Sequence, residues 1–282
     1  MKSFCIKTNN KSIIEYLLKN IEAIPLNDIY FINKHFKIYD NIIVHYKGEN
    51  IDLFCNYLSD ILSSTIINYY EPNLIKKIIN YNYFYFDDFE KKIILNNCND
   101  FIKEAQDDSL KFRKEELCIN ILNYITNNKT VVLDGFVNFR IPEYFDTLDY
   151  IVDFSVNKYV IEKEYTEFIN ILKLYVDSKP SNTRLVHLIY TNGESILLDD
   201  KKHVIPLSND MFDAKYLSDI SFSSNDFALN ALLTLIPEKI EIHLITFEDE
   251  FINTLKLIFG TRISICTDCN ICSTYKVLNN VR

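Results

Sequence analysis

The sequence predicts a mixed α/β fold (mixed α+β): an N-terminal small sheet plus helices, a long central helix, and a C-terminal βαβ domain with a mainly parallel sheet. Three observations lead to this prediction. Apolar residues recur at helical spacing over much of the first half of the 282-residue chain. A continuous helical pattern then runs between two prolines, at positions 142 and 180. After the second proline, short apolar runs alternate with helical segments.

The first part of the chain is expected to form a small sheet packed against helices. The pattern predicts a strand over residues 3–8 and a helix over residues 11–24. Residues 29–47 predict two strands joined by a turn, and the periodicity from residue 50 to 128 is helical. Residues 131–140 are interpreted as a short, apolar, partly extended connector.

A long helix is predicted between Pro142 and Pro180, because proline suits the first turn of a helix and cannot continue one. An unbroken helix of this length would span ~50 Å, so we expect a kink or a break within it. We expect two domains. Residues 1–178 would form an α-rich α+β region that ends in the long helix, and residues 180–282 an α/β domain that carries a cysteine cluster.

Strands and helices alternate in the C-terminal part. Asn192-Gly193 lies between two apolar runs, and this dipeptide favours a tight hairpin. Thr246 and Asp249 have the spacing of an N-terminal capping box. The elements predicted after the hairpin are strand 220–222, helix 225–236, strand 240–245, helix 248–259 and strand 263–266. Because helices of this length separate the strands, we expect parallel βαβ units with right-handed crossovers.

Composition excludes several classes of function. The chain is 48% hydrophobic and 24% charged, the balance of a folded globular protein. Its four glycines lie too far apart for a dinucleotide-binding fingerprint or a P-loop. The net charge of −9 disfavours nucleic acid as the main partner. We find neither a membrane span nor a signal peptide, so we expect a cytoplasmic protein with reduced thiols.

The most distinctive motif is the C-x2-C-x2-C cluster of Cys266, Cys269 and Cys272. It begins where the last predicted strand ends, and ligand sites lie beyond the carboxyl ends of parallel strands. Three thiols at this spacing can converge on one ion, but zinc and iron–sulfur clusters take four ligands. The ferredoxin spacing would require a cysteine at Lys276, so the fourth ligand must come from elsewhere. The candidates are His243, Cys5, His203, a carboxylate or a partner protein.

Several interpretations of the cluster stay open. It could bind Zn²⁺ or an iron–sulfur cluster, close the sheet edge with small buried thiols, or act as a redox dithiol. His187 and His243 lie inside apolar strands, where a histidine is more often a hydrogen-bonded core residue than a ligand. Catalytic residues stay unknown, because we recognise no catalytic motif. The sequence therefore favours a non-enzymatic regulatory or scaffold role over a redox, iron–sulfur or metal-dependent enzyme.

Three segments resemble the YtxC-like family, namely residues 135–141, 156–165 and 265–272. The resemblance extends from about residue 130 to residue 272. It implies a cytoplasmic protein of a sporulating bacterium of the Firmicutes. The long helix and the acidic C-terminal half suit contacts with protein partners in sporulation. The resemblance implies no catalytic residue, and no metal is carried over with the cysteine motif.

Overall fold

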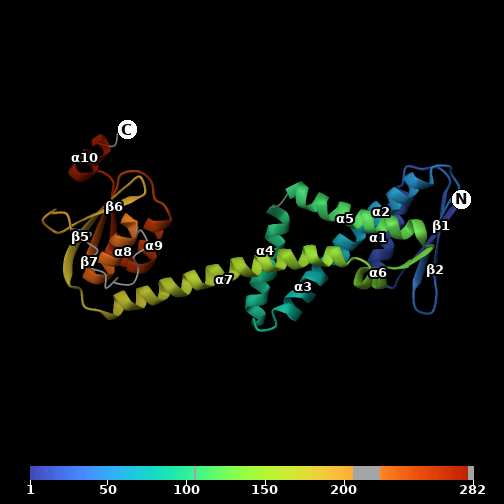
Figure 1. The fold of residues 1–282 in the computed structure, drawn as a ribbon, viewed down its shortest axis with the longest axis horizontal. Coiled ribbons are helices and arrows are strands. Elements are labelled where there is room, and N and C mark those ends of the chain that lie inside the picture. Colours follow the sequence, from blue (N-terminus) through green and yellow to red (C-terminus); the bar gives the residue numbers. More distant parts are fainter. Residues whose placement is uncertain (105, 206–222, 279–282) are drawn as a thin grey trace, which may run out of the picture. The chain divides into compact units, whose positions relative to one another are not determined.

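The computed structural model describes residues 1–104, 106–205 and 223–278 (Figure 1). The chain divides into two compact units, Met1–Ile161 and Glu162–Arg282. The described residues form helices and two sheets, and each sheet contains both parallel and antiparallel strand pairs. The predicted mixed α/β fold class is therefore confirmed.

The first unit contains a sheet with the strand order β2-β3-β1-β4. Its strands are β1 (Lys2–Thr8), β2 (Ile29–His35), β3 (Asp40–Tyr46) and β4 (Thr130–Val132). β3 pairs antiparallel with both β1 and β2, whereas the short β4 pairs parallel with β1. Phe4, Ile6 and Val44 are buried, and they alternate with less buried residues along β1 and β3, as strands with one covered face require.

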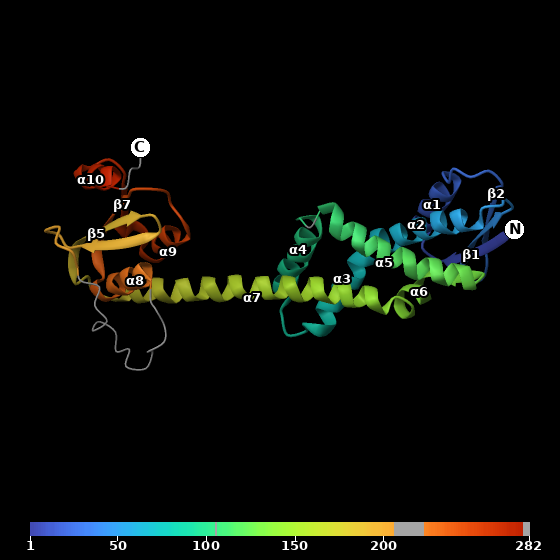
Figure 2. The ribbon, with the colours of Figure 1, turned by 45° about the horizontal axis from the view of Figure 1, so that its top comes forward.

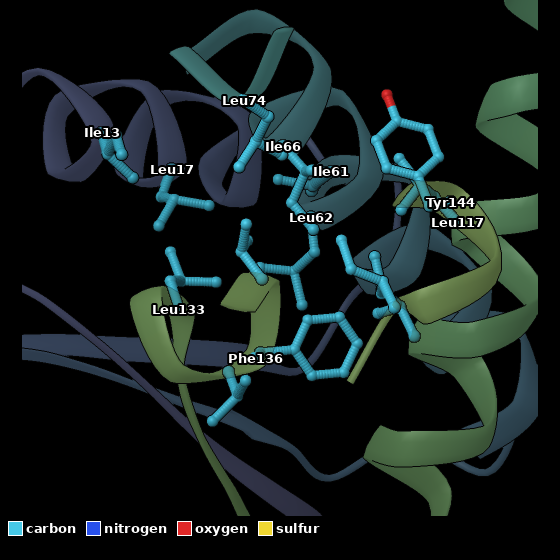
Figure 3. Close-up of a cluster of buried hydrophobic side chains, with 14 of the residues drawn as sticks. Ile13, Leu17, Ile61, Leu62, Ile66, Leu74, Leu117, Leu133, Phe136 and Tyr144 are labelled. Atoms are coloured by element: carbon cyan, nitrogen blue, oxygen red, sulfur yellow. The ribbon is translucent and has the colours of Figure 1, made fainter. Parts of the chain in front are cut away.

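Helices build most of the first unit. They are α1 (Lys11–Glu22), α2 (Ile51–Tyr69), α3 (Glu71–Asn82), α4 (Asp88–Glu104), α5 (Gln106–Asn127) and α6 (Leu133–Phe139). Side chains from several of these helices meet in one core, where Leu17 of α1, Leu62 of α2 and Phe136 of α6 lie together (Figure 3).

Residues 131–140 differ from the prediction. The expected partly extended connector forms the end of β4 and then the helix α6. Leu133, Phe136 and Val137 are buried at helical spacing, but a single turn of such spacing is too short to separate a helix from a strand in the sequence. Packing against the core therefore decides the local structure here.

The long helix α7 runs without interruption from Pro142 to Ser178, so of the expected kink or break, the break is wrong. The segment between its ends holds neither proline nor glycine. Leu148 and Val152 are buried in the core of the first unit, and Ile169 and Val176 are buried in the core of the second. Each end of the helix is thus stabilised by tertiary packing.

The second unit contains a sheet with the strand order β6-β5-β7-β8. Its elements are β5 (Thr183–Thr191), β6 (Glu194–Leu198), α8 (Ser224–Leu235), β7 (Pro237–Leu244), α9 (Glu250–Phe259), the 3-10 helix η2 (Gly260–Arg262), β8 (Ile263–Cys266) and α10 (Asn270–Leu278). β5 pairs antiparallel with β6, while β5–β7 and β7–β8 are parallel pairs. The mainly parallel C-terminal sheet is as predicted.

The hairpin between β5 and β6 turns at Asn192 and Gly193, as predicted. Both residues have positive φ, 51° and 81°, which is the conformation that a two-residue hairpin loop of this kind requires. The predicted strand at 220–222 lies outside the described residues.

The start of α9 differs from the prediction. Asp249, and not Thr246, is the N-cap residue: its side chain accepts hydrogen bonds from the N–H groups of Phe251 and Ile252. The Thr246 hydroxyl instead accepts a hydrogen bond from the N–H of Asn192. Contact with the hairpin therefore engages the Thr246 side chain, and Asp249 caps the helix in its place.

The two faces of the second sheet pack against different helices (Figure 2). Residues such as Leu188 and Ile242 face a core formed with α8, α9 and the end of α7. Ile189 of β5 and Ile245, which directly follows β7, point to the opposite face, where they form a smaller cluster with Cys272 of α10. The cysteine motif therefore lies on the face opposite to α8 and α9.

Candidate metal centre

The polypeptide places three thiols and one imidazole at the end of β8. Cys266 is the last residue of β8 and pairs in register with His243 of β7. Cys269 directly precedes α10. Its Sγ accepts a hydrogen bond from the backbone N–H of Cys272, which lies in the first turn of that helix. The connecting loop is tied down by Lys276, whose Nζ donates to the carbonyl of Thr267. A strand end and a helix start thus hold the cluster from two sides.

The four side chains converge on one point. The Nδ1 atom of His243 lies 3.4 Å from the Sγ of Cys269 and 3.5 Å from the Sγ of Cys272. The Sγ of Cys272 lies 3.6 Å from that of Cys269 and 3.8 Å from that of Cys266. All four donor atoms lie within 4.8 Å of one another, so they are close enough to hold a metal ion.

These distances agree with the edges of a zinc tetrahedron. With Zn–S bonds of ~2.3 Å and a Zn–N bond of ~2.0 Å, ideal S–S edges are ~3.8 Å and S–N edges ~3.5 Å. A cubane iron–sulfur cluster would separate the sulfurs much further, to about 6 Å, because each cysteine binds a different iron. The geometry therefore suits a single ion better than a cluster.

The environment shifts the pKa values of Cys269 and Cys272, the two thiols of the C-x2-C pair, in opposite directions. Burial opposes ionisation of Cys269, but hydrogen bonds from the N–H of Cys272 and from the neighbouring thiols outweigh it and lower the pKa of Cys269. Burial raises the pKa of Cys272 to about 12. Burial, followed by the proximity of His187, lowers the pKa of His243, which keeps this ring neutral as a ligand must be.

The other candidates for the fourth ligand have other contacts. Cys5 belongs to the sheet of the first unit, where its Sγ lies 3.8 Å from the Oδ1 of Asn41. His203 is exposed, and its Nδ1 lies 3.4 Å from a carboxylate oxygen of Asp199. Of the residues named from the sequence, His243 is the one that the structure brings to the three thiols.

Two further residues next to His243, His187 and Glu241, were not predicted from the sequence as parts of the site. The Nε2 atom of His243 lies 3.0 Å from the Nδ1 of His187, and that atom lies 3.4 Å from the Oε2 of Glu241. Both histidines are buried, as core histidines were expected to be. Glu241 precedes His243 by two positions in a strand, which places both on one face and was a signal available in the sequence.

Within the described residues, no helix combines the length and the apolar character that crossing a membrane needs.

Comparisons with known proteins confirm the family resemblance. The sequence model described as the YtxC-like family matches residues 56–264. The chain is also similar to a Bacillus subtilis (strain 168) protein named "Uncharacterized protein YtxC", with 23% identity over 216 residues, which cover 74% of this chain and 76% of that protein. No solved structure matches. The range matched by the family model includes His187 and His243 and ends just before Cys266.

Proposed function

This chain belongs to the YtxC-like family, and from that premise we propose a non-enzymatic regulatory or scaffold protein whose second unit is stabilised by one Zn²⁺. Cys266, Cys269, Cys272 and His243 would be the four ligands. The observation that carries the proposal is the agreement of four of the six S–S and S–N separations, 3.4 to 3.8 Å, with tetrahedral edges.

The donor set supports a structural site rather than a catalytic one. Four protein ligands complete the tetrahedron, whereas catalytic zinc sites keep one position open for water or substrate. Cys272 and His243 are also almost fully buried, at 0% and 2% exposure. An ion held in this way would link α10 to β7 and β8 of the sheet.

The cellular context is part of the same proposal. The family resemblance supports a role in sporulation, exercised through protein partners. All seven cysteines are free, which supports a reducing compartment such as the cytoplasm, where zinc and not oxidation decides the state of the thiols.

Metal analysis of the purified full chain without a histidine tag tests the proposal. We expect one equivalent of zinc per chain, and a lower melting temperature for Cys266→Ser, because metal binding free energy is also folding free energy. Cys5→Ser is the matched control: it removes a thiol outside the cluster and should keep the zinc. Less than about a tenth of an equivalent of any metal, together with unchanged melting of Cys266→Ser, would refute the zinc site.

A second function is favoured by one specific observation. Cys269 and Cys272 form a C-x2-C pair at the start of a helix, and the first thiol has a lowered pKa while the second is buried with a raised one. Such a pair could reduce a substrate disulfide: Cys269 attacks it, Cys272 resolves the mixed disulfide, and two electrons and two protons leave the dithiol. Rapid labelling of Cys269 in zinc-depleted and zinc-loaded protein alike would favour this enzyme over the structural site.

A further inference from the structure

We infer that His187, supported by Glu241, is the positioning residue that fixes His243 as an Nδ1 ligand of the metal. The inference rests on the proposed zinc site and extends it from four ligands to the groups that orient one of them.

The two nitrogens of His243 have separate partners. Nδ1 faces the sulfurs of Cys269 and Cys272, while Nε2 lies 3.0 Å from the Nδ1 of His187. A neutral imidazole carries one proton, and a metal ligand must present its lone pair. When Nδ1 of His243 binds the metal, its proton must therefore be on Nε2.

That N–H needs an acceptor, because His243 is only 2% exposed and a buried donor without a partner costs stability. The Nδ1 atom of His187 is at hydrogen-bond distance and can accept, provided that the proton of His187 is on its own Nε2. His187 can therefore accept the N–H of the one tautomer of His243 that binds metal. The opposite tautomer would direct an N–H at the thiols.

The carboxylate of Glu241 completes the arrangement. Glu241 pairs in register with His187 across β5 and β7 and stands two residues from His243, so the backbone sets all three on one face. Its Oε2 lies 3.4 Å from the Nδ1 of His187, the atom that accepts the N–H of His243 in this arrangement. A negative charge in this position stabilises that N–H and makes the ligand nitrogen a stronger donor to the metal.

The same three residues could in principle hold a second ion, since their donor atoms also lie within 4.8 Å of one another. His243 would then have to bind two ions at once and lose both ring protons. The 3.0 Å separation of the two ring nitrogens is that of an ordinary hydrogen bond, which needs no such ionisation. The geometry therefore favours a hydrogen-bonded support over a second metal site.

Zinc affinity of full-length variants, measured by competition with a chromophoric chelator, tests the inference. His187→Leu removes the acceptor and should weaken zinc binding 10- to 100-fold, the usual effect of losing the partner of a ligating histidine. His187→Asn offers its Oδ1 as a replacement acceptor and should stay within about threefold of the natural protein. Glu241→Gln, which keeps the shape of the side chain, should weaken binding by about threefold to tenfold.

The matched control is Ser195→Ala. Ser195 is another buried polar residue of the same sheet, and it donates a hydrogen bond to Asn225 rather than to the site. Its loss should leave zinc affinity unchanged even if it lowers the melting temperature. Zinc affinity that is kept in His187→Asn and lost in His187→Leu distinguishes a positioning role from a general loss of packing.

Each outcome has one meaning. Equal zinc affinity in the natural protein, His187→Leu and Glu241→Gln would overturn the inference and leave the zinc site intact. If the natural protein binds two metal equivalents per chain and His187→Leu binds one, the three residues hold a second ion and not a hydrogen-bonded support. A natural protein that binds no zinc would overturn the proposed function as well. Long-range ¹H–¹⁵N NMR spectra of the zinc-loaded protein should show the proton of His243 on Nε2.

Discussion

At the scale of single residues, the cluster contains one thiol that resists ionisation. Burial raises the pKa of Cys272 far above neutrality, so this thiol keeps its proton in the metal-free protein at ordinary pH. Zinc binds the thiolate, and binding must therefore release that proton. Below the raised pKa, apparent zinc affinity should consequently rise by at least about tenfold per pH unit.

Calorimetry in buffers of different ionisation enthalpy would count the released protons at constant pH. A pH-independent affinity with no proton release would contradict the involvement of Cys272. Cys5→Ser should leave the slope of affinity against pH unchanged, because Cys5 lies outside the cluster.

A second residue-scale prediction concerns a buried charge in the first unit. The carboxylate of Glu71 accepts hydrogen bonds from the hydroxyl of Tyr144 and from the Nε of Arg113, and all three side chains are buried. Glu71→Leu removes the anion that faces the Arg113 guanidinium, and should lower the free energy of unfolding by about 3 kcal/mol or more. Urea unfolding measures this loss.

The exposed ion pair between Lys114 and Asp60 is the matched control for that substitution. The side chain of Asp60 is 56% exposed, so solvent screens the pair, and Asp60→Asn should cost about 1 kcal/mol or less. Equal losses in the two variants would show that burial of the Glu71 carboxylate does not determine its contribution.

At the scale of elements, the β5–β6 hairpin depends on backbone conformation. Gly193 has φ of +81° and no atom near the place of a Cβ, so a side chain there meets strain but no clash. Gly193→Ala should destabilise the protein by about 1 kcal/mol. Gly135→Ala in α6 should instead stabilise it by about 0.5 kcal/mol, because alanine favours helices. Urea titrations of the two variants measure both changes in the free energy of unfolding. Changes of the same sign would contradict this explanation.

The elements that the sequence predicted well are those with long or chemically specific signals. The bounds of strand 263–266 were predicted correctly, and so was the turn of the hairpin at Asn192-Gly193. The structure of residues 131–140 was not predicted, because the short helix α6 leaves too short a pattern. The expected break in α7 rested on the usual size of a domain, and such an argument carries no information on where a particular helix ends.

The candidate site was predictable in part for the same reason. The spacing of the three cysteines is local in sequence, and His243 could be placed at the end of a neighbouring parallel strand. The support from His187 could not be predicted, because it depends on which residues of β5 and β7 pair in register. A shift of that register by one residue would turn one of the two histidines to the opposite face.

At the scale of the whole molecule, the buried cores are separate. One core lies within residues 4–160, and the cores of the second unit, including the cluster around Cys272, lie within residues 169–275. Free energy gained from metal binding acts through the contacts that the ligands make. Those contacts belong to β7, β8 and α10, so zinc should stabilise the second unit and leave the first unit unaffected.

Hydrogen–deuterium exchange of the full chain, with zinc and with a chelator, would test this separation. Removing zinc should speed exchange in α10, β8 and β7, because their local unfolding no longer breaks metal bonds. Peptides of Met1–Ile161 should exchange equally in both states. Cys266→Ser serves as the control and should exchange alike with and without zinc. Faster exchange in Met1–Ile161 on zinc removal would show that the two units share their stability, because metal bonds in one would then protect amides in the other.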